Sequence, residues 1–572
     1  MKKLIVLLLV LTLLLCSCGR AVDFLKEKIG EEDTTAEETS QNEEGVVEEN
    51  SGISLDSISN QWFSDPGKSN NRLKKLSKGG NGKAILELAR NYYRENNVVQ
   101  LEGLFDQYAF EQWEGYGEGL SMLAAFNVDR AKELFIENEG EIEVVDRFNF
   151  FLALMTTEES EYAKDKIMEL IEEENPSATE INTMVEKATS ILNRDILEKL
   201  LEKTDKNIPA KAAFNNAEEM TMDMCSFKDE QGNWYNVISY ATIEGDKIKV
   251  QNAKTGREVF QLEYKEASYM IRLEVVQIDG IENPCIAVSC NDYFENKEGV
   301  FIKIYSWTGK DLKEITELNH EELKIRGALL NGYKSAYTSE RLGQTLVCDL
   351  KRGDFAENLS EFYDDIGRLI DVHTFSYPYV EYDSLGKCFK CDIVTSAMVI
   401  TDDARASAVG ISDIAVNWID NRWVGQMSGK GGETMEYDED TPEIEKTRNV
   451  NEEFINWVKE STVEKIVRVF GAPDSSFYYN GGMGLHYEDM IEIYFDGERP
   501  SGVTPLGKGL FLGKKIPWSK QDIYEVFPEA EAEMESEYSE MIIYANKGDD
   551  MIAFTDGGNG FYPMMFFKGF EE

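Results

Sequence analysis

The stretch at residues 461–497 decides the fold of the C-terminal part and reads STVEKIVRVFGAPDSSFYYNGGMGLHYEDMIEIYFDG. Its first four residues, Ser461 to Glu464, form a capping box, which is typical of the start of a helix. Apolar residues at helical spacing follow, and Gly471-Ala-Pro473 is a stop signal for that helix. Two strands are predicted next, at 485–487 and 491–495, because aromatic and β-branched residues dominate there.

The same pattern recurs 57 positions later. The matched residues are Ile466 and Ile523, Val469 and Val526, Phe470 and Phe527, and Tyr487 and Tyr544. The second copy departs from the first in two ways: Pro528 stands where the first copy has Gly471, and an acidic insertion occupies 529–540. The recurrence predicts a tandem α/β repeat.

A helix ending in Phe-Gly-x-Pro-Asp, a Tyr-centred strand and an apolar strand that closes at Asp-Gly resemble the β-lactamase-inhibitor-protein-like fold, over roughly 451–570. The resemblance implies a module that binds proteins through the concave face of its sheet. It carries no catalytic residues to transfer. A terminal domain with a structural role and no partner of its own is the alternative.

The chain begins MKKLIVLLLVLTLLLCSCGR, in which Lys2 and Lys3 precede an apolar run at 4–15. This arrangement is typical of a secretory signal. Residues 15–19 resemble the lipobox of bacterial lipoproteins, which implies that Cys18 receives the lipid and that 1–17 are removed. Cys16 would place a bulky leucine where a small residue is needed. The alternative, a transmembrane anchor, needs roughly 20 apolar residues, and the run has twelve.

The 572-residue chain is strongly acidic, with 107 Asp and Glu against 59 Lys and Arg and a formal net charge of −48. Loss of Lys2 and Lys3 with the signal leaves 57 basic residues, and the net charge becomes −50. A surface that acidic repels phosphate groups. We therefore expect neither a nucleic-acid partner nor direct adsorption to an anionic membrane.

Changes in composition along the chain predict a multidomain α+β protein, since single cores stop growing near about 250–300 residues. Its parts are an N-terminal helical bundle or solenoid, a middle antiparallel β region and the C-terminal α/β repeat. The predicted segments are a signal peptide at 1–17, an acidic disordered linker at 18–59, a helical domain at 60–208, a β-rich domain at 209–428, a linker at 429–450 and the repeat domain at 451–572.

Two shorter patterns support this plan. Ile85, Leu88, Ala89 and Tyr92 fall on one face of a helix, and 127–135 resembles a tetratricopeptide helix without a settled 34-residue spacing. In the middle region two Thr-Gly pairs lie 53 residues apart, at 255–256 and 308–309. A strand-rich unit of this length resembles a β-propeller blade. A plain antiparallel sheet assembly is the alternative, and 277–283 has too few carboxylates for a calcium cage.

Six cysteines follow Cys18, all in the middle third of the chain: Cys225, Cys285, Cys290, Cys348, Cys388 and Cys391. An even number in an exported chain allows disulfides, but buried thiols are the favoured interpretation. Cys388 and Cys391 form an isolated C-x-x-C motif without a second pair or a nearby histidine, so neither zinc binding nor thioredoxin chemistry is indicated.

We find no catalytic, cofactor or metal motif. The chain has three histidines, at 320, 373 and 486, and no nucleophile elbow. The glycine-rich 77–84 lacks the first glycine and the hydroxyl residue of a phosphate loop, and it is interpreted as the entry to the first helix.

The expected function is therefore non-catalytic. We expect a lipid-anchored protein on the extracytoplasmic face of the cell membrane that binds a protein partner through its C-terminal domain in the cell envelope. The alternatives are an envelope hydrolase that uses paired carboxylates and a purely structural surface lipoprotein.

Overall fold

The computed structural model describes residues 54–567 with internal gaps. The gaps are 174–175, 191–193, 204–219, 243–244, 265–270, 279, 292–299, 320–324, 354–355, 371, 400–405, 430–431, 436–448, 480–481, 489, 508 and 535–540. Cys18, the signal and most of the acidic linker lie outside the described residues. Within the described part, no helix is both long and apolar enough to span a bilayer.

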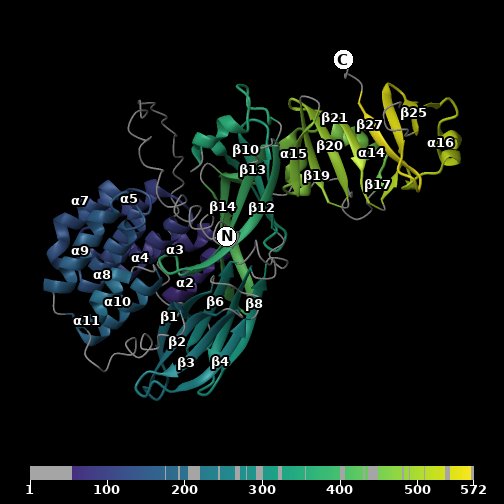
Figure 1. Cartoon of the computed structure of the whole chain (residues 1–572). Helices are drawn as coiled ribbons and strands as arrows, with labels where there is room; N and C mark the ends of the chain where they lie inside the picture. The colour runs from purple at the N-terminus through teal and green to yellow at the C-terminus, as the bar shows by residue number, and fades with distance from the viewer. Residues whose placement is uncertain are drawn as a thin grey trace.

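An N-terminal helical region comes first (Figure 1). Its α-helices are α2 (Leu55–Asn60), α3 (Pro66–Lys78), α4 (Gly82–Arg94), α5 (Val98–Gln107), α6 (Tyr116–Ala124), α7 (Val128–Asn138), α8 (Val144–Leu154), α9 (Ser160–Glu173), α10 (Ala178–Ser190) and α11 (Arg194–Lys203). Helices α4, α6, α8 and α10 contact one another in a row, and α9 contacts α11. Consecutive helices such as α3 and α4, α6 and α7, and α8 and α9 also contact each other, so the helices stack as pairs, as in a short solenoid.

The predicted helix signals are found in this region. Ile85, Leu88, Ala89 and Tyr92 are all buried in its core. Ser177 and Glu180 form the capping box predicted for α10: the Ser177 amide donates to Glu180 Oε2 over 2.6 Å, and the Glu180 amide donates to Ser177 Oγ over 3.3 Å. One boundary was wrong, because α2 begins at Leu55, inside the predicted linker, where Ile58 is buried.

Two four-stranded antiparallel sheets follow, each with its strands in sequence order. The first contains β1 (Met220–Lys228), β2 (Trp234–Thr242), β3 (Gly245–Asn252) and β4 (Glu258–Tyr264); the second contains β5 (Arg272–Val276), β6 (Cys285–Asn291), β7 (Val300–Trp307) and β8 (Leu312–Asn319). Both Thr-Gly pairs lie in the turn between the third and fourth strands. The repeat inferred from them is therefore a four-stranded unit.

A third sheet is completed by a distant strand. Strands β9 (Ile325–Leu330), β10 (Lys334–Ser339) and β11 (Gln344–Asp349) are joined by β16 (Gly432–Met435), which pairs with β11. Because β16 lies within the predicted linker at 429–450, that segment is not wholly a linker. Its last residues also form β17 (Asn449–Val450), which pairs with β22 (Leu510–Phe511).

The largest sheet has twelve strands and crosses from the middle region into the C-terminal part. Four long strands, β12 (Val372–Asp383), β13 (Cys388–Val399), β14 (Ala406–Ile419) and β15 (Arg422–Ser428), form one end. Strand β12 pairs with β18 at His373 and Phe477, so the two regions share one sheet. Figure 1 shows the long strands between the helical region and the C-terminal strands.

The C-terminal part contains two copies of one helix followed by four strands. The first copy is α15 (Val463–Phe470), β18 (Ser475–Tyr479), β19 (Gly482–Tyr487), β20 (Ile491–Asp496) and β21 (Arg499–Pro505); the second is α16 (Lys520–Val526), β24 (Glu531–Met534), β25 (Met541–Lys547), β26 (Asp550–Asp556) and β27 (Phe561–Phe566). Helix α14 (Glu452–Lys459) precedes the first copy, and β23 (Lys514–Lys515) pairs with β22. Helix α15 begins at Val463, and α16 begins 57 positions later, at Lys520.

The order β18-β19-β20-β21-β27-β26-β25-β24 joins the two copies through β21 and β27. The predicted capping box at Ser461 was displaced by one residue: Thr462 caps α15 by accepting from the Lys465 amide over 3.2 Å. Ser461 instead donates its hydroxyl to the Trp457 carbonyl over 2.6 Å, which joins it to the end of α14.

Candidate functional site

The C-terminal sheet has one face packed on helices and one open face. Residues such as Leu485, Ile493 and Ile552 are buried in a core with apolar residues of α14, α15 and α16. Directly paired residues point to the same face of a sheet, so the strand register identifies what the opposite face carries. That face is crossed by one row of paired residues: Phe477, Gly484, Tyr494, Gly502, Phe566, Met551 and Asn546. We call it the open-face row.

Aromatic side chains gather at the β18 end of the open-face row. The Tyr494 ring lies 4.5 Å from the Tyr479 ring and 6.2 Å from the Phe477 ring. The Tyr479 hydroxyl reaches Met564 Sδ on β27 at 4.0 Å. Farther along, Met551 is 40% exposed, and Phe566 is half-buried. Tyr494 itself is buried beneath its neighbours at 5% exposure, so the side chains that reach solvent on this face are those of Phe477, Tyr479, Phe566 and Met551.

Two glycines in the open-face row, Gly484 and Gly502, leave space for the neighbouring side chains and backbone. A Cβ on Gly484 would lie 2.3 Å from Phe477 Cζ, so the Phe477 ring occupies the space above that glycine. A Cβ on Gly502 would lie 2.6 Å from the Met565 carbonyl oxygen. Side chains at these two positions would displace their neighbours, and the aromatic arrangement therefore depends on both glycines.

A polar cluster flanks the aromatic residues. Glu492 accepts a hydrogen bond from the Tyr494 hydroxyl over 2.5 Å and lies 2.9 Å from His486 Nδ1. Burial, together with the hydrogen bond to Glu492, raises the pKa of the Tyr494 hydroxyl well above its ordinary range. Tyr494 is therefore a neutral hydrogen-bond donor at physiological pH. The cluster can fix the orientation of a bound partner, and nothing in it forms a nucleophile–base pair.

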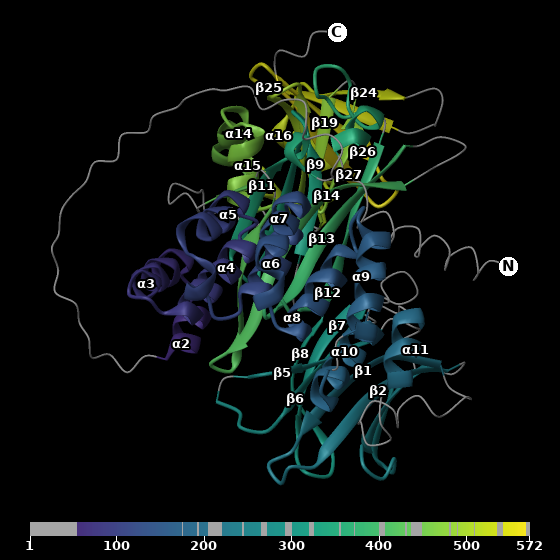
Figure 2. The ribbon, with the colours of Figure 1, turned by 90° about the vertical axis from the view of Figure 1, so that its left-hand side faces the viewer.

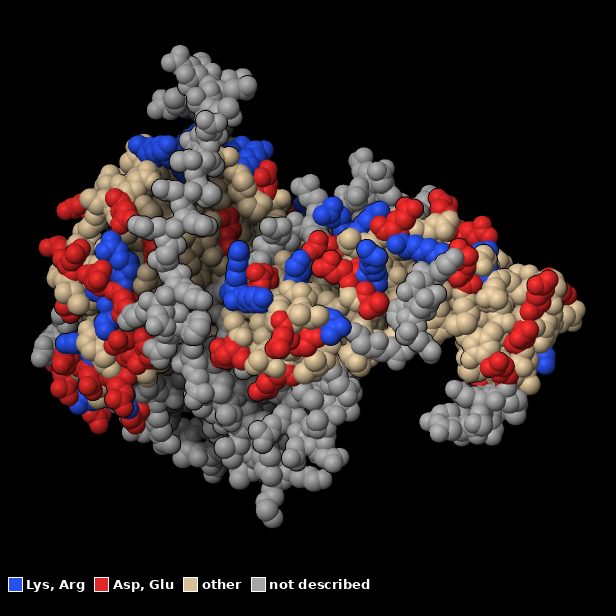
Figure 3. Space-filling view, turned by 90° about the horizontal axis from the view of Figure 1, so that it is seen from above, with Lys and Arg blue, Asp and Glu red and all other residues tan. Residues whose placement is uncertain are grey.

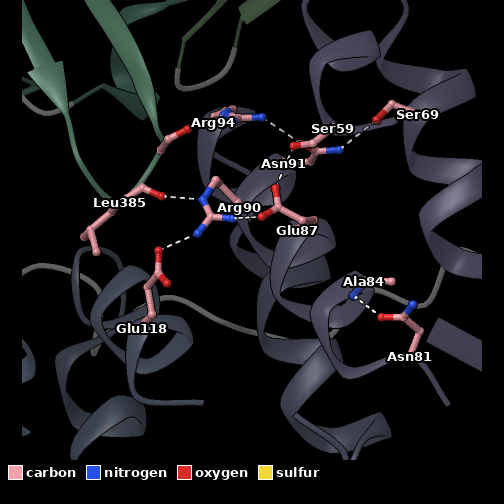
Figure 4. Close-up of polar contacts among 11 residues, drawn as sticks. Ser59, Ser69, Asn81, Ala84, Glu87, Arg90, Asn91, Arg94, Glu118 and Leu385 are labelled. Carbon is pink, nitrogen blue, oxygen red and sulfur yellow. Dashed lines mark hydrogen bonds and ion pairs between the residues drawn. The ribbon is translucent and has the colours of Figure 1, made fainter. Parts of the chain in front are cut away.

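A second polar assembly holds the helical region against β12–β15 (Figure 4). Arg90 on α4 is fully buried, and its Nε donates to the Leu385 carbonyl in the β12–β13 turn over 2.9 Å. The same guanidinium pairs with Glu87 and Glu118. Burial alone would raise the pKa of Glu87, but Arg90 and a hydrogen bond from Ser59 hold it below its ordinary value.

Arg94 lies one turn farther along α4 and contacts the same turn. Its Nε donates to the Gly386 carbonyl over 2.6 Å, and its guanidinium lies 5.3 and 4.8 Å from the Trp62 and Phe63 ring centres. Both carbonyls belong to a backbone segment more than 290 positions away in the chain. The two arginines therefore dock the helical region on one particular hairpin.

Acidic side chains lie on the helix-facing side of this sheet. Asp392 of β13 lies opposite Tyr379 of β12, and the register between β13 and β14 places Asp413 of β14 on the other side of Asp392. Asp413 Oδ2 accepts a hydrogen bond from the Asn96 side chain over 2.8 Å. Burial and the neighbouring Asp413 raise the pKa of Asp392 well above its usual range. Asp392 Oδ1 is buried and accepts no hydrogen bond from the described residues.

The six cysteines that follow Cys18 are buried and carry thiols, as predicted. Burial raises the pKa of Cys285 to about 11 and that of Cys388 to about 12, so these thiols are protonated and unreactive near neutral pH. Cys388 packs with Trp62 and Phe63, whereas Cys391 packs in the core on the other side of the sheet. The two members of the C-x-x-C motif therefore face opposite ways.

The remaining candidates do not form a site. His320 lies outside the described residues, and His486 makes the contact with Glu492 given above. In the described part of the chain, no group of His, Cys, Asp and Glu side chains is arranged to hold a metal ion. The glycine-rich 77–84 joins α3 to α4, with Asn81 capping α4, so its interpretation as the entry to the first helix was wrong.

Sequence reasoning missed Arg90, Arg94 and the carboxylates that they and Asn96 bring together. The arginines sit at i and i+4 on a helix whose other face is apolar, a pattern that also describes an ordinary exposed face. A face of the C-terminal sheet was named from the sequence, but none of the residues in the open-face row was. Side chains alternate between the two faces of a strand, and this alternation in β18–β20 would have identified the aromatic members of the row.

Comparisons with known proteins add little. No family model matches the chain, and no curated protein is significantly similar to it. Among solved structures, a chain described as "Structure of Dos1 propeller" is 10% identical, with 60% of this chain and 68% of that chain covered, at a TM-score of 0.15. A score that low supports no conclusion about fold or function. The coarse architecture of the chain is an N-terminal helical region followed by a large antiparallel β region.

Proposed function

We propose that this chain is a lipid-anchored protein of the extracytoplasmic face of the cell membrane, which acts by binding another protein through the open face of its C-terminal sheet. The observation that carries the proposal is the open-face row, in which Phe477, Tyr494, Phe566 and Met551 share one face. Aromatic residues and methionine are enriched at protein interfaces because they offer large contact area on few rotatable bonds. The resemblance to the β-lactamase-inhibitor-protein-like fold supports the same use of the face.

The charge around this face defines the partner. Glu492 lies beside the aromatic residues, and Glu531 and Glu533 are exposed on the edge strand β24. An acidic rim around an aromatic centre favours a partner that presents apolar residues surrounded by Lys and Arg. We therefore propose a basic protein surface as the ligand, recognised outside the cytoplasm.

A pull-down from detergent-solubilised membranes tests the binding step. The bait is the full chain, compared with a double variant, Tyr479→Ala with Phe566→Ala, that removes two rings from the open face. Val99→Ala with Ile136→Ala is the matched control, because these residues are exposed on the helical region. We expect a protein recovered with the parent and the control and depleted at least tenfold with the open-face variant. Equal recovery with all three baits would contradict the proposal.

The anchor is supported by the sequence alone, through Lys2, Lys3, the apolar run and Cys18. Intact-mass analysis of the protein isolated from membranes tests it separately. We expect a chain that begins at Cys18 and carries a diacylglycerol, and we expect Cys18→Ser to abolish that mass. A chain that retains residues 1–17 would contradict the anchor and leave the binding proposal to its own test.

An envelope hydrolase with paired carboxylates is the second candidate, because Asp392 and Asp413 occupy opposed positions on β13 and β14. Asn96 of the helical region contacts Asp413, which favours a docking role for this pair. If the full chain hydrolyses cell-wall glycan and Asp413→Asn abolishes this activity, the pair is catalytic. If the parent chain shows no turnover, the role of Asp413 is to dock the helical region.

A further inference from the structure

Helix α3 and the start of α4 carry a dense run of basic residues in this acidic chain. Between Pro66 and Leu86 the sequence holds six basic residues and no acidic one; they are Lys68, Arg72, Lys74, Lys75, Lys78 and Lys83. We call this set the basic helix patch. Local charge decides contacts at a surface, because screening limits electrostatic interactions to about 8–10 Å at physiological salt. The net charge of −48 therefore does not describe this patch.

The patch faces outward. Ser69, Leu73 and Ser77 are buried on one side of α3, whereas the lysines at 68, 74, 75 and 78 are exposed. At 100° per residue the four lysines fall within one outward half of the helix. Figure 2 places α3 at an edge of the helical region, and Figure 3 shows blue side chains gathered at a margin of that region.

Among the lysines of α3, Lys74 lies with its Nζ 5.6 Å from the centre of the Tyr92 ring, and none has an acidic partner in the described part of the chain. Lys83 pairs with Glu114 at 3.3 Å, and Arg72 donates to the Gln61 side chain over 2.8 Å. Among the described residues, no acidic side chain lies within ion-pair distance of the other four members of the patch. Leu76 lies between Lys75 and Lys78 and is 37% exposed, which adds an apolar side chain to the same helix.

We infer that the basic helix patch binds the anionic headgroups of the bilayer in which the lipid on Cys18 is inserted. This inference rests on the anchor proposed above. Asp65, which caps α3, follows Cys18 by 47 positions. Helix α2 lies within that interval, so the coil predicted for the linker covers at most the 35 positions at 19–53. A coil of that length would span about 30–35 Å, which lets α3 reach the bilayer. Lysines beside an exposed leucine fit a headgroup layer, since their stems cover apolar surface while their ammonium groups reach phosphates.

Contact through α3 would set the orientation of the whole protein. Lipid on Cys18 fixes only one point of the chain, whereas a second, electrostatic contact limits how the folded part can turn. The C-terminal sheet lies far from α3 in Figure 1, so its open face would be held away from the bilayer and toward a partner.

Vesicle co-sedimentation of a chain that starts at residue 18 and carries Cys18→Ser tests this inference without the acyl chain. The probes are vesicles with 30% phosphatidylglycerol in phosphatidylcholine, and pure phosphatidylcholine vesicles, at 0.1 M and 0.5 M salt. Each Lys near an anionic bilayer strengthens binding by roughly fivefold. We expect binding to the anionic vesicles at 0.1 M salt that falls at least tenfold in Lys74→Gln, Lys75→Gln, Lys78→Gln.

A charge-matched control replaces three exposed lysines on the β sheets, Lys254→Gln, Lys310→Gln and Lys313→Gln. We expect this control to bind like the parent, and we expect binding to vanish at 0.5 M salt. Equal binding by the α3 variant, or equal binding to neutral vesicles, would overturn the inference.

The acidic stretch at 31–50 of the same chain is the competing occupant of the patch. Vesicle binding that appears only after deletion of 31–50 would also overturn the inference, because that stretch would then be the ligand. Since no lipid is attached in this assay, its outcome does not depend on whether Cys18 is modified in cells.

Discussion

Arg90 joins the helical region to the central sheet through a hydrogen bond to the Leu385 carbonyl. Its guanidinium is fully buried and contacts Glu87, Glu118 and the Leu385 carbonyl. Removing one partner of a buried ion pair leaves the other charges without compensation, which is more costly than losing the pair as a whole.

We predict that Arg90→Met lowers the free energy of unfolding by about 3–5 kcal/mol. Arg130→Met is the control, because Arg130 makes exposed ion pairs with Asp106 and Glu133, and such pairs contribute about 0–1 kcal/mol. Urea denaturation followed by circular dichroism measures both. Equal effects of the two substitutions would show that the docking contact is not stabilising.

The buried Asp392 carboxyl makes the free energy of unfolding depend on pH. Its pKa is raised in the folded state, so ionisation opposes folding once the pH exceeds the unfolded value of about 3.9. Asp392→Asn should therefore be more stable than the parent at pH 7, by about 1–3 kcal/mol. The difference should shrink toward zero as the pH falls to 4. Denaturation at pH 4, 5, 6 and 7 checks this, and a stability gain that is independent of pH would contradict it.

Single residues also show why part of the site could not be predicted. The hydrogen-bond partner of Arg90 on the sheet is the backbone carbonyl of Leu385. Any residue type at position 385 supplies a carbonyl, so the sequence holds no signal for this contact. Cys388 and Cys391 looked like a pair because they are close in the chain. A strand turns residues three apart to opposite faces, and that distinction depends on recognising β13 first.

At the scale of elements, the tandem repeat was the most predictable feature. The apolar spacing of Ile466, Val469 and Phe470 recurs at Ile523, Val526 and Phe527, and the first residue of each set is fully buried, although Val526 is 40% exposed. The long strands β12–β15 were harder to predict as one sheet with the C-terminal strands. Polar residues on their helix-facing side interrupt the apolar pattern, and the pairing of β12 with β18 joins segments about a hundred residues apart.

The junction between the first two sheets depends on Asp223 of β1. This buried carboxylate accepts from the Met224 amide over 2.9 Å and from the Leu273 amide of β5 over 2.8 Å. We predict that Asp223→Ala speeds amide hydrogen exchange at Leu273, because that donor loses its acceptor. Leu318 of β8, which is buried in another core, is the internal reference. Unchanged exchange at Leu273 relative to Leu318 would show that Asp223 does not hold the two sheets together.

At the scale of the whole molecule, the proposed binding face lies at the far end of a continuous sheet from the helical region. The solenoid packs on one end of that sheet through Arg90 and Arg94, and the tandem repeat forms the other. Composition predicted the succession of helical and β regions, since it follows local periodicity. It could not predict that one sheet crosses the segment at 429–450, because strand order depends on contacts between distant parts of the chain.

The central claim is that the open face is occupied by a protein partner in cells. Site-specific photo-crosslinking from position 551 tests it most directly, with position 526 on α16 as the control, because Met551 and Val526 are both 40% exposed and lie on different elements. The account predicts a discrete crosslinked protein from position 551 and none from position 526. No crosslink from 551, or the same products from both positions, would contradict it.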